Sequence, residues 1–122
     1  MEFCVDRPIY MQIGTDIKEQ ILSGRLRAGD KLLSVREYSM FYEVSPLTIQ
    51  RAMQYLEQEK VICSQRGVGN FVRDRAREQL EDGMIGQEIK SFVERLRKRG
   101  LSGSEILEMV GREVKRGGRD DD

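Results

Sequence analysis

The chain has 122 residues, enough for one compact domain and an appendage but not for two full cores. It has no histidine and only two cysteines, which excludes Ser-His and Cys-His nucleophiles, imidazole metal sites and a disulfide scaffold; no enzyme, cofactor or metal is expected. Its 21 basic and 21 acidic side chains cancel, and the two signs also balance within residues 1–74 and within residues 75–122, so bulk charge does not indicate a nucleic-acid partner.

The hydropathy of the chain predicts a cytoplasmic protein without a membrane partner. Residues 1–6 carry acids and lack an apolar signal core. No stretch approaches the roughly 18 uninterrupted apolar residues that span a bilayer. Cys4 and Cys63 suit a reducing compartment, as packing or surface residues.

The first two helices are marked by periodicity and by their end signals. Apolar side chains at three- and four-residue spacing predict a helix over residues 9–23, with Gly24 as a left-handed cap. A second helix is predicted from Ser34 to Tyr42. Its first residues fit a capping box, because the Ser34 hydroxyl and the Glu37 carboxylate can each satisfy a donor at the helix end.

The third helix, predicted from Pro46 to Glu59 with Ser45 as its cap, has a polar outward face. That face carries two amides, one guanidinium and no acid, and its residues are Leu47, Gln50, Arg51 and Gln54. Amides and guanidinium groups make bidentate hydrogen bonds to adenine and guanine edges in a major groove. The pattern indicates base reading, and a merely polar, solvated surface is the plainer interpretation of this segment by itself.

Two β-prone runs follow at residues 61–65 and 70–73, joined by the tip Arg66-Gly67-Val68-Gly69. Alone, such a hairpin is more often structural than functional. Directly after two helices joined by a short turn, it is the expected wing of a winged helix-turn-helix. In that setting Gly67 and Gly69 would let the backbone approach DNA closely, with Arg66 at the tip.

The remainder, residues 75–116, is predicted to form two helices with one apolar stripe each. Gly100 ends the first helix, and Ser102-Gly103-Ser104-Glu105 is a second capping box. The stripes consist of Ile85, Ile89, Phe92, Val93 and Leu96, then Ile106, Leu107, Val110 and Val114. Two short helices cannot bury these residues alone, so they must pack on the first domain or on a partner chain. Residues 117–122 are expected to be a disordered tail.

The first 74 residues resemble the GntR family of bacterial transcriptional regulators. The resemblance is carried by Pro8-Ile9-Tyr10-Met11-Gln12-Ile13, Ile21-Leu22-Ser23-Gly24, Gly29-Asp30-Lys31-Leu32, Ser34-Val35-Arg36-Glu37 and Arg66-Gly67-Val68-Gly69-Asn70-Phe71-Val72. The string from Val44 to Ala52 and the two-helix tail are similar to the YtrA-type branch. The resemblance implies a mainly α fold with a small β-hairpin, in which residues 1–74 are a winged helix-turn-helix DNA-binding domain and residues 75–116 a two-helix dimerisation segment.

The resemblance also implies a function and the residues that serve it. The implied DNA contacts are Arg36, Ser45, Pro46, Leu47, Thr48, Gln50, Arg51 and Gly67, and the hairpin pattern adds Arg66. The implied protein is a homodimer, joined by the two C-terminal stripes, that represses transcription from a palindromic operator in double-stranded DNA. In this branch the operon often encodes an ABC transporter. The alternative is a winged helix that serves as a protein-interaction module, and no effector ligand can be deduced.

Three residues depart from the pattern of that family. Leu33 replaces the proline that usually precedes the capping serine. Leu47 stands where a polar residue is common, so its contact would be apolar, for example with a thymine methyl group. Lys60 stands where glycine is usual, and it would be strained if that position is left-handed.

Overall fold

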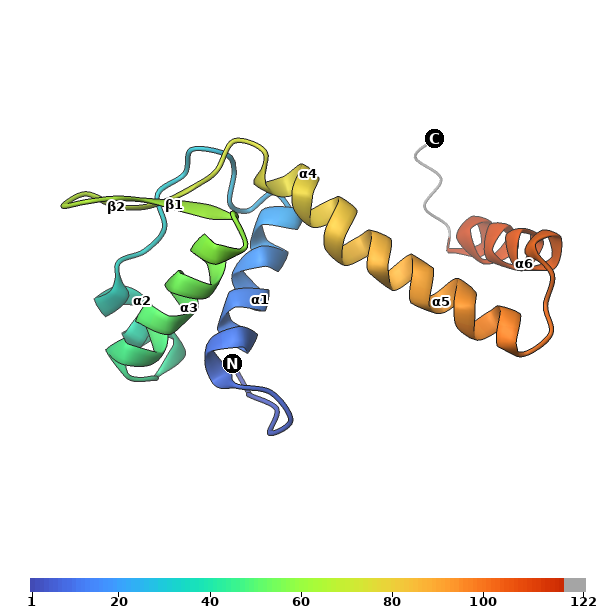
Figure 1. Cartoon of the computed structure of the whole chain (residues 1–122), viewed down its shortest axis with the longest axis horizontal. Helices are drawn as coiled ribbons and strands as arrows, with labels where there is room; N and C mark the ends of the chain where they lie inside the picture. The colour runs from blue at the N-terminus through green and yellow to red at the C-terminus, as the bar shows by residue number, and fades with distance from the viewer. Residues whose placement is uncertain (118–122) are drawn as a thin grey trace. The chain divides into compact units, whose positions relative to one another are not determined.

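The computed structural model of the chain describes residues 1–117 (Figure 1). The chain divides into two compact units, one over Met1–Gly83 and a second that begins at Met84. The expected boundary lay after Asp74. The first unit continues further because the helix that follows the hairpin buries Ala76 and Leu80. Of the tail expected over residues 117–122, Gly117 caps the last helix, and the rest lies outside the described residues.

Three helices of the first unit pack around one apolar core. They are α1 (Ile9–Leu22), α2 (Val35–Tyr42) and α3 (Pro46–Gln58), and α3 packs against both of the others. The fully buried large side chains of this core are Ile13, Ile17, Ile21, Ile49, Leu56, Val61 and Ile62. Burial of each such side chain contributes about 1.5–3 kcal/mol. The three helices confirm the prediction, although α1 and α3 each end one residue earlier than expected.

The predicted capping signals define the starts of α2 and α3, and a left-handed residue ends α2. Ser34 Oγ accepts a hydrogen bond from the Glu37 amide at 3.1 Å, and the Ser34 amide donates to Glu37 Oε1 at 2.8 Å, so the capping box is confirmed. Glu43 ends α2 in the left-handed region, with φ of 56°. Ser45 Oγ then accepts from the Thr48 amide at 3.2 Å and caps α3.

Lys60 adopts the left-handed conformation that was expected to strain it. Its φ is 60°, and its amide donates to the Glu57 carbonyl at 3.0 Å. The next amide, from Val61, donates to the Leu56 carbonyl at 3.0 Å. A non-glycine residue therefore turns the chain from α3 into the hairpin, at a cost of roughly 1–2 kcal/mol in backbone strain.

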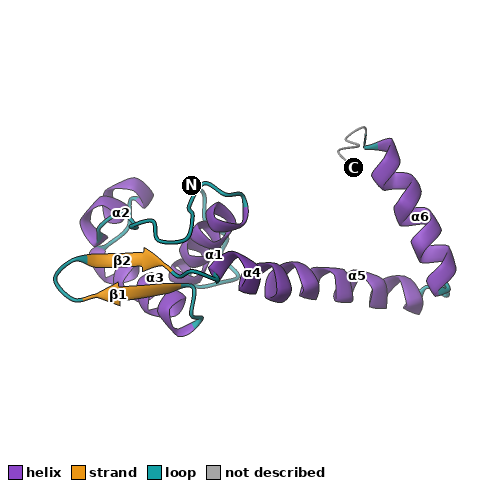
Figure 2. Cartoon of the chain, turned by 90° about the horizontal axis from the view of Figure 1, so that it is seen from above, coloured by secondary structure: helices purple, strands orange, loops and turns teal. Residues whose placement is uncertain are grey.

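The predicted hairpin is present as two antiparallel strands (Figure 2). β1 (Ile62–Gln65) pairs with β2 (Gly69–Val72), with Ile62 opposite Val72 and Gln65 opposite Gly69. Ile62 and Val72 are buried, so this side of the hairpin closes the core. A bridge between Lys31 and Phe71 holds the segment before α2 against the outer edge of β2.

The segment predicted as two helices contains more elements than expected. α4 (Ala76–Leu80) leads into a π-helical turn, η1 (Glu81–Ile85), and then into α5 (Gly86–Lys98) and α6 (Gly103–Arg116). Gly83 within the turn and Gly86 after it favour a helix less than other residues do, and this is where the regular pattern breaks. The capping box of α6 is confirmed, since Ser102 Oγ accepts from the Glu105 amide at 3.2 Å. Over residues 1–117, no helix combines the length and apolar character needed to cross a membrane.

Candidate nucleic-acid interface

The start of α3 presents polar and apolar side chains to solvent. Ser45, Pro46, Leu47, Gln50 and Arg51 are all exposed, and only Thr48 of the predicted contacts on this helix is half-buried. The Thr48 hydroxyl lies 3.0 Å from Ser45 Oγ, within the cap. The opposite stripe of the helix is buried, which fixes the outward direction of the exposed face.

The hairpin tip and the start of α2 lie on the same side of the first unit as the start of α3 (Figures 1 and 2). Arg36, Arg66 and Gly67 are exposed there. A groove of about 360 Å³ joins the two elements, because its lining includes Ser34 and Glu37 of the capping box together with hairpin residues such as Val68. The start of α2 and the hairpin tip thus line one groove, and the start of α3 lies on the same side of the first unit.

Lys31 belongs to this surface, although it was not among the DNA contacts predicted from the sequence. It lines the groove between α2 and the hairpin, and its side chain is laid across Gly69. A Cβ atom on Gly69 would lie 2.8 Å from Lys31 Cε, so glycine at this position makes room for the lysine. The bridge from Lys31 to β2 is a tertiary contact, and no local pattern in the sequence indicated it.

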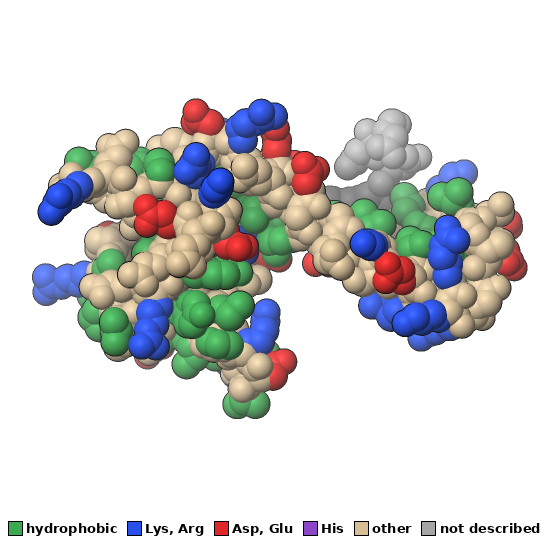
Figure 3. Space-filling model, in the orientation of Figure 1, with side chains coloured by type: hydrophobic (Ala, Val, Ile, Leu, Met, Phe, Trp, Pro, Cys, Tyr) green, Lys and Arg blue, Asp and Glu red, His purple; other side chains and the backbone are tan. Residues whose placement is uncertain are grey.

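The charge of this surface is mainly positive. Lys31, Arg36, Arg51 and Arg66 supply cations, and Figure 3 shows Lys and Arg side chains projecting at this end of the first unit. The one carboxylate of the α2 cap, on Glu37, is occupied by hydrogen bonds. Those bonds, first from the Ser34 backbone amide and then from its side chain, hold the pKa of Glu37 below its usual value.

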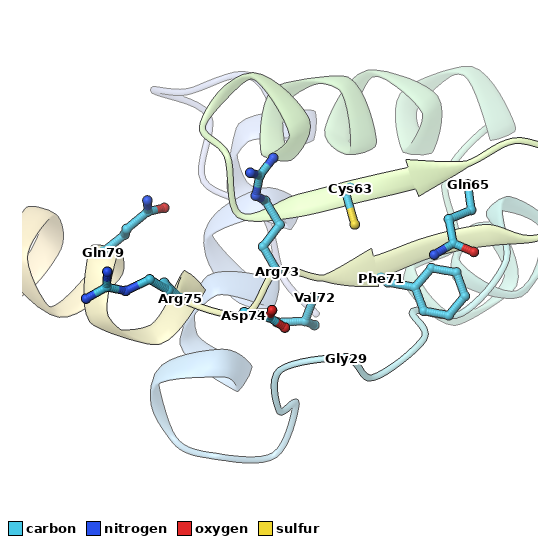
Figure 4. Close-up of a pocket in the computed structure, with 9 residues that line it drawn as sticks. All are labelled: Gly29, Cys63, Gln65, Phe71, Val72, Arg73, Asp74, Arg75 and Gln79. Carbon is cyan, nitrogen blue, oxygen red and sulfur yellow. The ribbon is translucent and has the colours of Figure 1, made fainter.

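A larger groove, of about 650 Å³, lies at the root of the hairpin (Figure 4). Cys63 and Phe71 face each other in register on the side of the hairpin that points away from the core. Arg73 and Arg75 line the groove, but so does Asp74, and Arg75 Nη2 is bound to Glu78 at 2.9 Å. The root therefore carries mixed charge, whereas the tip, residues 65–70, contains Arg66 and no acid. The tip is the part of the hairpin that suits a phosphate backbone.

No group of three or more His, Cys, Asp or Glu side chains that could hold a metal comes together within residues 1–117. Cys4 is exposed and Cys63 is half-buried, and both are free thiols. The arrangement can bind a polyanion through hydrogen bonds and charge.

The second unit leaves most of its predicted interface residues accessible in the single chain. Ile85, Ile89, Phe92, Leu107, Val110 and Val114 are exposed, Val93 and Leu96 are half-buried, and only Ile106 is buried. Met109, which the prediction did not include, is exposed as well. Apolar side chains gathered on two helices in this way are typical of a surface that meets a partner.

The sequence of the chain is similar to those of known bacterial regulatory proteins. The model of the family described as bacterial regulatory proteins, gntR family, matches residues 9–72. The chain is 34% identical to the HTH-type transcriptional regulator YhcF of Bacillus subtilis over 111 residues, which cover 89% of this chain and 92% of YhcF. It is 37% identical to the HTH-type transcriptional repressor YtrA of the same organism over 89 residues, which cover 70% of this chain and 68% of YtrA.

A solved structure, that of a GntR family transcriptional regulator from Listeria monocytogenes, is also similar. The match has a TM-score of 0.81 and 39% sequence identity, and it covers 90% of this chain and 98% of that chain. The similarity to YhcF and to the Listeria protein therefore extends beyond the winged unit over most of the sequence.

Proposed function

The chain belongs to the GntR family of bacterial regulatory proteins and is a DNA-binding transcriptional regulator, and from this premise we propose that it acts as a homodimeric repressor at a palindromic operator. The observation that carries the proposal is that cations and amides of α2, α3 and the hairpin tip are exposed on one side of the first unit. The repressor role is supported by the name of YtrA, which describes that relative as a transcriptional repressor.

In this proposal α3 lies in the major groove and reads bases. Gln50 and Arg51 are exposed on its outward face and carry the groups that pair with adenine and guanine edges. Leu47, whose side chain is 58% exposed, contacts a thymine methyl group. The exposed start of the helix, at Ser45 and Pro46, directs its positive end toward a phosphate, and Thr48 lies beside it.

The remaining contacts hold the DNA backbone. Arg36 at the start of α2 and Arg66 at the hairpin tip are exposed cations suited to phosphate oxygens, and Lys31 in the groove between them is a third. Gly67, with φ of 79° and nothing within 4 Å of the position of a Cβ, lets the tip approach the duplex. Contacts of this kind set affinity and register rather than sequence preference.

Dimerisation is proposed to occur through the exposed apolar residues of the second unit. Each Leu, Ile, Val or Phe side chain buried in an interface contributes about 1.5–3 kcal/mol, and a single chain leaves several of them accessible. A two-fold interface would present two α3 helices to half-sites separated by about one helical turn, roughly 34–36 Å. A palindromic operator is the matching DNA symmetry.

The regulated genes are proposed from the resemblance to the YtrA-type branch, which implies an operon for an ABC transporter and a protein that works in the cytoplasm. Transcript levels in a strain that lacks the gene test this target. Increased transcription of a neighbouring transporter operon is expected. Unchanged transcription of every neighbouring transporter gene would contradict it.

A second candidate function, a winged helix that binds another protein, has one observation in its favour. Met40 and Phe41 on α2 are 74% and 64% exposed, and large exposed apolar side chains are common where proteins meet. The cations at the start of α2 and at the hairpin tip favour DNA instead. Binding to a duplex decides between the two.

The deciding experiment uses the full chain and a library of randomised duplexes long enough for two half-sites. Selection by the protein should enrich a palindrome, and affinity for the enriched duplex should fall steeply as salt rises. The matched control is a duplex of the same composition in scrambled order. Equal binding to the two duplexes, or binding to neither, would contradict sequence-specific repression.

A further inference from the structure

Lys18 is the one charged side chain buried within residues 1–117, and it lies between α1 and α3. Its side chain is 7% exposed. The ammonium donates to Tyr55 Oη at 2.9 Å and to Glu59 Oε1 at 3.0 Å. Burial lowers the pKa of Lys18, but the hydrogen bonds to Tyr55 and Glu59 outweigh it and hold that pKa above its usual value. Lys18 is therefore an ammonium at neutral pH.

Tyr55, the first partner of Lys18, is held on several sides. A Cβ atom on Gly14 would lie 2.6 Å from the Tyr55 ring, so the ring lies directly against the backbone of α1. Tyr10 packs edge-on against the same ring, with centroids 6.1 Å apart. Lys18 Nζ completes the arrangement at 4.6 Å from the ring centroid. This contact joins α1 to the C-terminal half of α3.

The contact between Lys18 and Tyr55 lies next to the face of α3 that is proposed to read DNA. Arg51 lies one helical turn before Tyr55 on α3, and the two line a groove of about 390 Å³ together with Tyr10. The apolar stripe of α3 contains Ala52, which is small, and Met53, which is flexible. The buried stripe determines which face of α3 points outward, but apolar contacts are non-directional and leave room for small rotations about the helix axis. Hydrogen bonds to a buried ammonium are directional.

We infer that Lys18 is a positioning residue for base reading: by holding Tyr55 and Glu59, it fixes the rotation of α3 about its own axis and so aims Arg51 and Gln50 into the groove. The inference rests on the proposed function of α3. A rotation of about 20° would move side-chain atoms at the helix surface by about 2 Å, more than a hydrogen bond tolerates. Lys18 never touches DNA in this role.

The test is Lys18→Met in the full chain, measured with the selected duplex and with its scrambled control. Methionine has a similar shape, and the Glu59 side chain is 50% exposed, so water can solvate the carboxylate that loses its partner. Affinity for the selected duplex should fall about tenfold, the value of one good base contact, whereas affinity for the scrambled duplex and the melting temperature stay near wild type. Glu19→Met, an exposed position on the same helix, is the matched control and should change none of the three.

A second variant, Tyr55→Phe, removes the hydroxyl and keeps the ring. It should reduce discrimination in the same direction, and the double variant should be no worse than Lys18→Met, because the two residues act as one unit. A parallel loss of melting temperature and of both affinities in Lys18→Met and in Tyr55→Phe would make the contact merely structural and overturn the inference. Unchanged discrimination by both variants would overturn it as well. Failure of the wild-type chain to discriminate between the duplexes would instead refute the proposed function on which the inference rests.

Discussion

Single residues of the proposed DNA surface divide into those that read bases and those that hold phosphates. Arg51 is exposed on the outward face of α3, whereas Arg36 is exposed at the start of α2, where the capping box holds the helix end. Both guanidinium groups are accessible, so their removal leaves the core intact. The two positions therefore allow the two kinds of contact to be measured separately.

Arg51→Ala and Arg36→Ala should both weaken binding to the selected duplex without lowering the melting temperature. Loss of a base contact costs about 1–3 kcal/mol, and loss of a phosphate contact reduces the salt slope by about one. Arg25→Ala, in the exposed turn after α1, is the control and should bind like wild type. Wild-type affinity in both test variants at matched salt would show that the reading surface lies elsewhere.

Gly67→Val should damage DNA binding more than it damages the fold. The position has φ of 79°, which a β-branched side chain adopts only with strain, and the added side chain would also stand between the tip and the duplex. Gly24→Val is a matched control, because Gly24 has φ of 87° and equally open surroundings. Calorimetry should give similar losses of stability for the two variants. If their DNA affinities also fall equally, the hairpin tip does not approach DNA.

Among the elements, α2 depends on its first turn more than a longer helix would, because it has only 8 residues. Ser34→Ala should lower the free energy of unfolding by about 0.5–2 kcal/mol, the usual value of such a cap. Urea unfolding measures the loss. Ser23→Ala, whose hydroxyl donates only to the Gln20 carbonyl in an exposed turn, should cost less. An equal cost for the two would mean that the cap does not stabilise α2.

The capping box also predicts a dependence on pH. The Ser34 backbone amide, and then its side chain, hold the pKa of Glu37 below its ordinary value of 4.5. The folded state therefore binds the proton less tightly than the unfolded state, and the stabilising contribution of Glu37 is fully present above pH 4.5 and is lost as pH falls through the lowered value. The difference in stability between wild type and Glu37→Gln should shrink below pH 4.5 in urea titrations. A constant difference for Glu37→Gln would refute the assignment.

The elements with local signals were predictable, and those that depend on distant contacts were not. The caps at Ser34 and Ser102 and the glycine-containing hairpin tip are encoded within four or five neighbouring residues. α4 was missed because it is short and is held by burial of Ala76 and Leu80 in the core of the first unit.

The candidate site shows the same division at the scale of side chains. Exposed positions on α3 follow from its periodicity, and all the predicted DNA contacts except Thr48 are indeed exposed. Lys31 was missed because its position depends on pairing with Phe71. Lys18 was missed because a lysine within an amphipathic helix usually lies in solvent, and its burial depends on Tyr55, 37 residues further along the chain.

At the scale of the whole molecule, the two units have different requirements. The first unit has its own core, whereas the second exposes residues such as Phe92 and Val114. Phe92→Asp should therefore give a monomer that is still folded over residues 1–83 and binds the selected duplex weakly. Sedimentation at micromolar concentration measures the change. The control is Lys90→Asp, which should remain dimeric because residue 90 is two positions away on α5 and so lies on a different side of the helix. A wild-type chain that sediments as a monomer would refute the dimer.

The core of the first unit also bears on how such a regulator would respond to its own abundance. If the winged unit, which has its own core, folds without a partner, free monomers in the cell would be folded species rather than unfolded chains. Under the proposed dimer, occupancy of the operator at low abundance then rises with the square of the protein concentration. Small changes in synthesis or dilution at cell division would be amplified at the promoter, and the strength of the contact between the second units would set the threshold.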